Sequence, residues 1–207
     1  MQQTTPTWRR AMAATALAAA VVQGIARAPH ARDYTSQTWR GAPDPFDNAL
    51  LGAMGAAMIA GPALYATGSL RRLDYPLPPT GRRLLAAAGV AAQAAGLWLF
   101  HRSHADLGRN WTPHVELRDD QGLVTDGVYA RIRHPMYASQ LVTQAGVACL
   151  LQNAVAGPAS FAAFLVLYLR RAPREESLMR ARFGPIRDEY ARRTGGVWPR
   201  FTRERRA

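Results

Sequence analysis

The chain has 207 residues, a formal net charge of +12 at neutral pH and one cysteine, Cys149. A single cysteine excludes an intrachain disulfide and a thiolate metal cluster. All 26 basic residues are arginines, and twelve of them follow Leu169, whereas long stretches elsewhere have no charge. Nucleic-acid binding needs cations clustered along one surface, while basic segments that flank apolar runs are typical of a membrane protein. We therefore expect a membrane protein that binds neither nucleic acid nor metal.

Three uncharged runs in the first half predict membrane helices at residues 11–26, 48–70 and 84–100. The first run would be about 24 Å long as a helix, which is short against a hydrocarbon core of about 30 Å. It is compatible with a signal peptide that has a small-residue cleavage site, but we expect a retained helix because more spans follow. The second run is rich in glycine and alanine, which let helices in lipid approach closely.

The fourth uncharged run, residues 135–169, is too long for one span and slightly short for two. The sequence QNAVAGP at residues 152–158 interrupts it and predicts a tight helical hairpin. Because both ends of a hairpin return to the same side, the polar segments before and after it should meet on one membrane face.

The arginine-rich tail places the C-terminus in the cytoplasm by the positive-inside rule. Counting back through five spans then places the loop at residues 71–83 outside, although that loop has four arginines and one acid. Either this loop departs from the rule or one of the first three helices does not cross. We expect the tail to decide the orientation, with the protein in the plasma (inner) membrane and its site facing the cytoplasm.

The sequence GVYARIRHPMY, residues 127–137, stands at the start of the hairpin. Pro135 suits the first turn of a helix, which places His134 at the helix boundary with Tyr129 and Tyr137 nearby. The free N–H groups of a helix N-terminus favour an anionic group. Arginines and tyrosines also anchor helix ends at the lipid headgroups, so the segment fits either a binding site or an interface.

A second polar segment follows the hairpin, where Glu175 and Glu176 begin a predicted amphipathic helix. Leu178, Met179 and Phe183 are expected to face the membrane while arginines face the headgroups. Acidic residues in a first turn also complement the helix dipole. Set against so many arginines, however, the two carboxylates would suit a cationic or hydroxyl-bearing ligand.

Together, LGRNWTPHVELRDDQGLVTDGVYARIRHPMY, the hairpin and REESLMRARFG resemble the isoprenylcysteine carboxyl methyltransferase family. This wider group of membrane methyltransferases includes phospholipid N-methyltransferases. The resemblance covers about residues 107–199 and also rests on Tyr190 and the terminal WPRF. It implies an S-adenosylmethionine site at the cytoplasmic mouth of the hairpin, without a soluble Rossmann-type domain. Consistently, the chain has no glycine-rich loop after a strand.

The resemblance also implies which residues form the site. The expected cofactor contacts are Gln121, Gly122, Leu123, Val124, Tyr129, His134, Pro135, Met136, Tyr137 and Glu175. Glu175 is expected to hold a polar group of the cofactor, and Arg171 matches a basic residue near the methyl acceptor, so Arg171 and His134 are the expected catalytic residues. Many relatives have histidine where this chain has Gln121, and glutamine can hydrogen-bond but cannot carry a proton at neutral pH.

We therefore expect a single all-α, polytopic integral membrane domain over residues 1–207, with about five transmembrane helices. Residues 1–104 form the N-terminal helices, and residues 105–207 form the cofactor-binding half, with the hairpin at 135–169 and a cytoplasmic amphipathic helix. The expected activity is carboxyl O-methylation of an isoprenylcysteine-like or other lipophilic acceptor in membrane lipid. N-methylation of a phospholipid or small lipid is the alternative enzyme, and a non-catalytic protein whose tail binds anionic lipid is the third hypothesis.

The two enzymatic hypotheses place different demands on the protein. A carboxylate acceptor is ionised at neutral pH, so it needs a cation to hold it in line, for which Arg171 is the candidate. An amine acceptor would have to lose a proton, to His134, Tyr137 or Glu176. In either case the enzyme contributes mainly positioning and desolvation.

Overall fold

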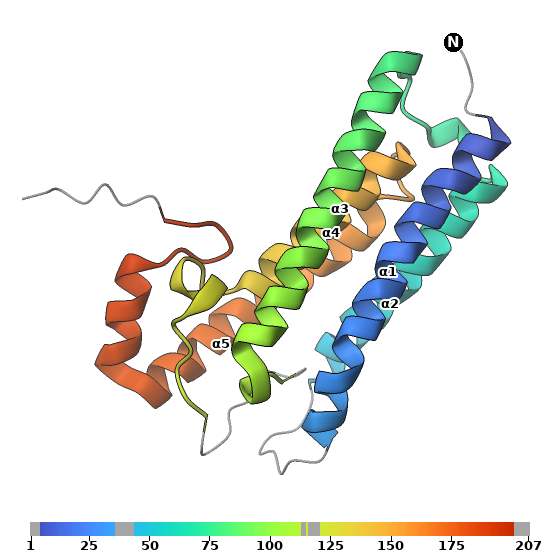
Figure 1. The fold of residues 1–207 in the computed structure, drawn as a ribbon. Helices are drawn as coiled ribbons and strands as arrows, with labels where there is room; N and C mark the ends of the chain where they lie inside the picture. The colour runs from blue at the N-terminus through green and yellow to red at the C-terminus, as the bar shows by residue number, and fades with distance from the viewer. Residues whose placement is uncertain (1–4, 36–43, 113–114, 116–120, 201–207) are drawn as a thin grey trace, which may run out of the picture.

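The computed structural model describes residues 5–35, 44–112, 115 and 121–200 (Figure 1). This part of the chain folds into α-helices joined by short 3₁₀ turns, and it has isolated β-bridges but no strand. The predicted all-α class is therefore confirmed. The α-helices are α1 (Pro6–Thr35), α2 (Pro45–Thr67), α3 (Pro79–Leu107), α4 (Pro135–Leu151) and α5 (Pro158–Arg193).

Helix boundaries follow local chemistry. Every one of these helices begins with a proline, whose missing N–H would have no intrahelical partner at that position. The Asp44 carboxylate caps α2 by accepting hydrogen bonds from the backbone N–H groups of Phe46 at 2.9 Å and Asp47 at 3.3 Å. The same helix ends at Gly68, whose φ of +81° is the left-handed conformation that glycine adopts readily.

Three helical segments are long and apolar enough to cross a membrane, namely Pro6–His30, Pro45–Thr67 and Pro79–Asn110. The hairpin arms are shorter. Helix α4 has 17 residues, about 26 Å at the usual rise, and the uncharged beginning of α5, residues 158–169, is shorter again. The chain is thus an integral membrane protein by its apolar helices, and the fourth uncharged run forms the predicted hairpin, whose turn contains Gln152 in the left-handed conformation.

The predicted amphipathic helix is not a separate element. Helix α5 continues from the second hairpin arm past Pro173 and the glutamates, and it turns sharply only at Gly184, where φ is +51°. Figure 1 shows the part of α5 beyond this kink, in red, lying away from the bundle. The kink lets the end of the chain fold back toward the residues that precede α4.

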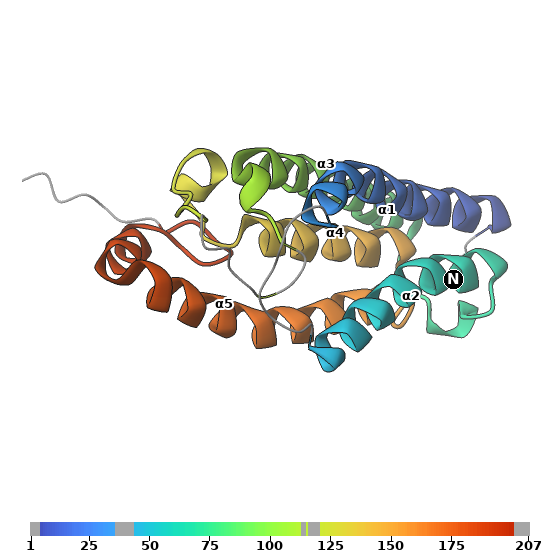
Figure 2. The same cartoon turned by 90° about the horizontal axis from the view of Figure 1, so that it is seen from below.

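Helix α4 lies between α3 and α5, and α2 lies beside α5 (Figure 2). Glycines bring α3 and α4 close together: a Cβ added at Gly89 would lie 2.9 Å from the carbonyl oxygen of Gly146. Of the glycines in the second uncharged run, Gly61 packs closely, against Ala156, whereas Gly52 and Gly55 would have no neighbour within 4 Å of an added Cβ. The predicted close approach therefore occurs mainly between α3 and α4.

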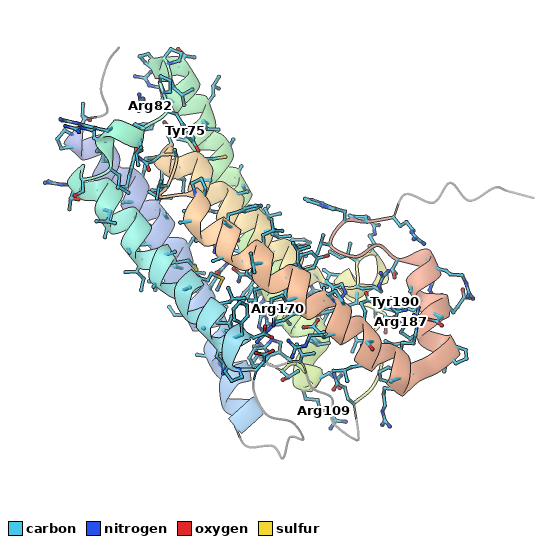
Figure 3. All side chains as sticks on the ribbon, turned by 180° about the vertical axis from the view of Figure 1, so that it is seen from behind. Tyr75, Arg82, Arg109, Arg170, Arg187 and Tyr190 are labelled. Carbon is cyan, nitrogen blue, oxygen red and sulfur yellow. The ribbon has the colours of Figure 1, made fainter. Side chains whose placement is uncertain are left out.

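Side-chain hydrogen bonds fasten one end of the bundle, through a far-end cluster of Arg9, Tyr65, Asp74 and Asn153. Arg9 is 3% exposed, donates to the carbonyl oxygen of Tyr65 at 2.8 Å and forms an ion pair with Asp74. Asn153, in the hairpin turn, donates to Asp74 at 2.9 Å. In Figure 3 the labelled Tyr75 and Arg82 mark this end, and Arg109 and Arg170 mark the opposite end.

Candidate functional site

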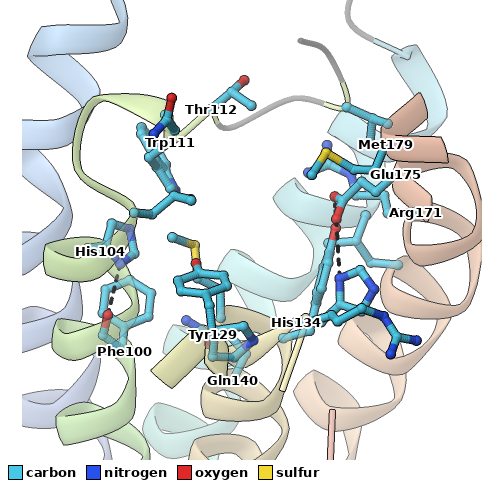
Figure 4. Close-up of a pocket in the computed structure, with 18 of the residues that line it drawn as sticks. Phe100, His104, Trp111, Thr112, Tyr129, His134, Gln140, Arg171, Glu175 and Met179 are labelled. Carbon is cyan, nitrogen blue, oxygen red and sulfur yellow. Dashed lines mark hydrogen bonds and ion pairs between the residues drawn. The ribbon is translucent and has the colours of Figure 1, made fainter. Parts of the chain in front are cut away.

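A cavity of about 230 Å³, the main cavity, lies at the end of the bundle opposite the far-end cluster. All five α-helices contribute to its wall, including Arg27 of α1, Leu51 of α2, His104 of α3, Tyr137 of α4 and Arg171 of α5. Figure 4 shows His104 and Trp111 on one wall and Arg171, Glu175 and Met179 on the opposite wall.

A smaller cavity of about 70 Å³, the side cavity, adjoins the main one and shares Gln121, Tyr129, Arg133 and His134 with it. Glu176 and the part of α5 beyond its kink complete the wall of the side cavity. Small-molecule sites usually measure about 300–1,000 Å³, so the two cavities together approach the lower end of that range.

The glutamates of α5 contact the start of α4, as the hairpin geometry predicted. His134 Nε2 lies 2.8 Å from Glu176 Oε1, which also accepts a hydrogen bond from Arg133 Nε at 2.8 Å. The Tyr137 hydroxyl donates to Glu175 Oε1, and His134 Nδ1 lies 3.6 Å from Glu175 Oε2. One imidazole therefore lies between two carboxylates, at the boundary between the two cavities.

Every residue predicted to contact the cofactor, together with Arg171, lines at least one cavity. The side cavity includes Gly122, Leu123 and Val124, the main cavity includes Pro135, Met136, Tyr137, Arg171 and Glu175, and both include Gln121, Tyr129 and His134. Their roles toward a cofactor or acceptor stay predictions. The Gln121 side chain donates to the carbonyl oxygen of Asn110 at 3.2 Å, which joins this segment to the end of α3.

Arg171 has a partner that the sequence did not indicate. Its Nε lies 3.1 Å from Oδ2 of Asp47, a carboxylate of α2 that is 1% exposed. The same carboxylate lies 3.0 Å from Nη1 of Arg174 and 3.6 Å from Nε of Arg170. Since Asp44 also pairs with Arg174, at 3.0 Å, two acids at the start of α2 balance a row of three arginines on α5.

The C-terminal segment is fastened beside His134 by backbone hydrogen bonds. The N–H groups of Arg133 and His134 donate to the carbonyl oxygens of Gly195 at 2.9 Å and Gly196 at 3.1 Å. The Tyr190 hydroxyl donates to the carbonyl oxygen of Tyr129 at 2.6 Å, and burial raises the pKa of Tyr190 to about 12. Residues 194–196 therefore hold the backbone of His134, the residue that contacts both glutamates.

Sequence reasoning missed the contributions of α1, α2 and the end of α3 to the site, namely Arg27, Asp47 and His104. A signal for the first two existed, because Arg27 directly follows the first uncharged run and Asp47 directly precedes the second. Leu178 and Met179, which were predicted to face the membrane, both line the main cavity, and Leu178 is also 38% exposed, so their contact with the membrane stays a prediction. The kink lies beyond them, so this stretch of α5 still belongs to the bundle.

No group of three or more histidine, cysteine, aspartate or glutamate side chains suited to a metal gathers in the described part of the chain. His104, for example, contacts a backbone carbonyl oxygen and aromatic rings. Its Nδ1 contacts the carbonyl oxygen of Phe100 at 2.9 Å, and its ring lies 4.9 Å from that of His30. This pair of rings belongs to an aromatic wall that also includes Trp111, 5.4 Å from His104.

The fold and the site define an integral membrane protein with a cavity between its helices at one end, whose wall has both apolar and charged side chains. Residues 86–181 match the model of the isoprenylcysteine carboxyl methyltransferase family, so the resemblance predicted from the sequence is confirmed over this part of the chain. Protein-S-isoprenylcysteine O-methyltransferase B of Arabidopsis thaliana is 33% identical over 88 residues, which are 42% of this chain and 45% of that protein.

Two further similarities extend the comparison. The nickel-cobalt-cadmium resistance protein NccN of Alcaligenes xylosoxydans xylosoxydans is 31% identical over 99 residues, 47% of this chain and 46% of that protein. The structure of a eukaryotic intramembrane Ras methyltransferase, an isoprenylcysteine carboxyl methyltransferase, superposes with a TM-score of 0.51 at 25% identity, over 73% of this chain and 50% of that one. The matched region spans about half the length of the curated relatives.

Proposed function

We propose that the protein is an S-adenosylmethionine-dependent membrane methyltransferase that forms a methyl ester on the carboxylate of an isoprenylcysteine-like or other lipophilic acceptor. One observation supports this most directly: His134 and the two glutamates meet across the hairpin, beside a cavity within the region that matches the family. A lipid-binding helix hairpin would not need this contact, because headgroup binding requires only exposed cations.

The residues present fit the proposed cofactor. S-adenosylmethionine has an ammonium, a sulfonium and a carboxylate beside a flat adenine ring, and the cavities offer a carboxylate, a cation and aromatic rings. Glu175, with its side chain 30% exposed, would hold a cationic group, Arg133 would hold the carboxylate, and Tyr129 would flank the ring. When bound, the cofactor supplies a methyl group that its sulfonium has already activated.

The chain itself has to position the acceptor and keep water away. The acceptor carboxylate is ionised at neutral pH, so no protein group has to remove a proton. Arg171, held from behind by Asp47, presents a buried cation to it. The apolar wall between α2 and α5, formed by Leu51, Met54 and Phe164, suits a lipid tail and limits water access. Holding the reacting groups in line is the main source of rate acceleration in such a site.

N-methylation fits the geometry less well. His134 Nε2 is engaged by Glu176 at 2.8 Å, and the Tyr137 hydroxyl is engaged by Glu175. His134 and Tyr137, two of the three candidate bases, are therefore already in hydrogen bonds to carboxylates, and the third, Glu176, accepts a hydrogen bond from Arg133 and contacts His134. A carboxylate acceptor leaves these bonds intact.

We also propose that the cavity end faces the cytoplasm and that the membrane is the plasma (inner) membrane. Support comes from the tail, which has twelve arginines after Leu169 and leaves the bundle at the cavity end. The loop at residues 71–83 lies at the opposite end. Its one acid, Asp74, pairs with Arg9 of α1, and the Arg82 side chain donates to the carbonyl oxygen of Leu77.

Radiolabelled methyl transfer tests the function. Membranes that contain the full chain are incubated with S-adenosylmethionine labelled in its methyl group, and the product is treated with mild alkali. Volatile label is expected, because carboxyl methyl esters hydrolyse to methanol. Alkali-stable label in the lipid fraction would instead establish N-methylation, and absence of cofactor binding by calorimetry in detergent would refute both.

A pair of glutamate variants tests the placement of the cofactor. Glu175→Ala should abolish cofactor binding in the same calorimetric assay. Glu189→Ala is the matched control, because that side chain is 56% exposed and pairs with Arg192 away from both cavities. Normal binding by Glu175→Ala would contradict the assignment.

A further inference from the structure

Arg27 is the contribution of α1 to the polar wall of the main cavity. Its guanidinium carbon lies 5.1 Å from the centre of the Trp111 ring, and Trp111 is 5% exposed. A guanidinium at this distance over an aromatic face is attracted by the ring electrostatically. The contact therefore holds the half-buried cation beside Trp111.

Arg27 differs from the other cavity arginines in its charge balance. Arg133 pairs with Glu176 at 2.8 Å, Arg171 with Asp47 at 3.1 Å and Arg187 with Asp188 at 3.0 Å. Among the described residues, Arg27 has no carboxylate within 4.0 Å. A cation removed from bulk water is costly unless an anion compensates for it, and no described carboxylate does so for Arg27, so an anionic ligand in the cavity would be stabilised at this wall.

We propose that Arg27 binds the carboxylate of the methyl acceptor and determines specificity for it. This inference rests on the proposed function and goes beyond the region that matches the family, residues 86–181. A guanidinium presents paired N–H donors that match the two oxygens of a carboxylate. Arg171 supplies a second cation to the same cavity, but Asp47 neutralises much of its charge, which leaves Arg27 as the dominant positive group.

The charge arrangement also explains which acceptors are rejected. Arg27 and Arg171, in one partly desolvated cavity, repel an ammonium group beside them, because electrostatic interactions are stronger there than in water. Discrimination then arises from the unfavourable contact with the wrong acceptor as well as from the favourable one with the right acceptor. The ammonium of an aminophospholipid headgroup would meet this repulsion, whereas a prenylated cysteine carboxylate would not.

The test compares Arg27→Gln and Arg27→Lys with Arg10→Gln, using the full chain in detergent. Arg10 is the matched control, since it is exposed at the other end of the same helix and its replacement removes the same charge. The acceptor probe is N-acetyl-S-farnesylcysteine, and its carboxamide serves as an uncharged competitor. All variants must elute as single species with an unchanged melting temperature before kinetics are compared.

Loss of a hydrogen-bonded charge interaction corresponds to roughly a tenfold to hundredfold change, and we expect a rise of that size in KM for the acceptor in Arg27→Gln. Arg27→Lys should recover part of it, and Arg10→Gln should match the wild type. The Kd for S-adenosylmethionine should stay within about twofold. The acid should compete better than the carboxamide in the wild type, and the two should become equal in Arg27→Gln.

Other outcomes overturn the inference in recognisable ways. An unchanged acceptor KM would show that Arg27 only anchors the helix end, and a raised cofactor Kd with unchanged acceptor KM would assign Arg27 to the cofactor. Arg27-dependent stabilisation by phosphatidylglycerol vesicles without any acid preference would identify a lipid phosphate as the anion. If the wild type transfers no methyl group, the proposed function fails, and calorimetric binding of acid against carboxamide still tests Arg27.

Discussion

Replacing Asp47 by asparagine should loosen the contact between α2 and α5. The substitution keeps the shape of the side chain and removes the charge that balances Arg171. Both partners are buried, with side-chain exposures of 1% for Asp47 and 8% for Arg171, and their atoms lie 3.1 Å apart. Removing one partner of such a pair leaves an uncompensated buried charge, which typically costs about 3–5 kcal/mol.

The neighbouring ion pairs add little to this value. Arg170 and Arg174 are 44% and 43% exposed, and exposed pairs contribute at most about 1 kcal/mol each. Arg174 also keeps Asp44 as a partner at 3.0 Å. For a chain of this size each kcal/mol shifts the melting temperature by roughly 2–4 °C, so the Asp47→Asn protein should melt roughly 6–20 °C below the wild type.

The assay is thermal unfolding of the purified full chain in detergent, followed by intrinsic fluorescence. Asp44→Asn is the matched control, because asparagine is as good an N-cap as aspartate and that carboxylate is 26% exposed. The double variant Asp47→Asn with Arg171→Met should be about 2–3 kcal/mol more stable than the sum of the two single losses predicts. Additive losses, or a melting temperature for Asp47→Asn equal to that of the control, would refute the buried pairing.

Further predictions concern packing, alkaline stability and the far end. Gly96→Ala should destabilise the protein by about 1–3 kcal/mol, because the Cβ of the new alanine would lie 2.9 Å from the carbonyl oxygen of Ser139. Gly52→Ala is the control: the space around Gly52 is open, so this variant should be neutral or stabilising in the same melting assay. Burial raises the pKa of Tyr190 to about 12. The contribution of Tyr190 to stability should therefore be complete below about pH 10, the usual tyrosine pKa, and should be lost as pH rises through about 12. A Tyr190→Phe protein that shows the same alkaline loss of stability would contradict this. Asn153→Ala should cost about 1–3 kcal/mol by leaving buried acceptors unpaired, and unchanged denaturant unfolding would argue against the far-end cluster.

The helical hairpin was predictable because its two signals are local. An uncharged run of fixed length and an interrupting QNAVAGP specify two arms and a turn without knowledge of the other helices. The meeting of His134 with Glu175 and Glu176 then follows from the return of the second arm. This part of the site could therefore be derived from the order of residues alone.

The contributions of α1 and α2 were not predictable in the same way. Charge and hydropathy show that Arg27 and Asp47 stand at the ends of apolar runs, a position where many charges only contact headgroups. Which helix ends meet depends on side-chain packing between segments more than a hundred residues apart, as for Asp47 and Arg171. The place of Leu178 and Met179 in the cavity wall was not predictable for a related reason. It depends on where α5 bends, and a glycine in the sequence does not show by itself that a helix turns there.

The far-end cluster has a consequence for how a lipophilic molecule would enter. Arg9, Tyr65, Asp74 and Asn153 join α1, α2, the loop after α2 and the hairpin turn at one membrane surface. At the other surface the same helices surround cavities. Any separation of α2 from α5 should therefore pivot at the far end, and at the cavity end it would have to break the ion pairs of Asp44 and Asp47 with the arginines of α5. We expect a farnesyl-sized tail to enter sideways from the leaflet that contains the cavity, while the opposite leaflet meets a closed wall.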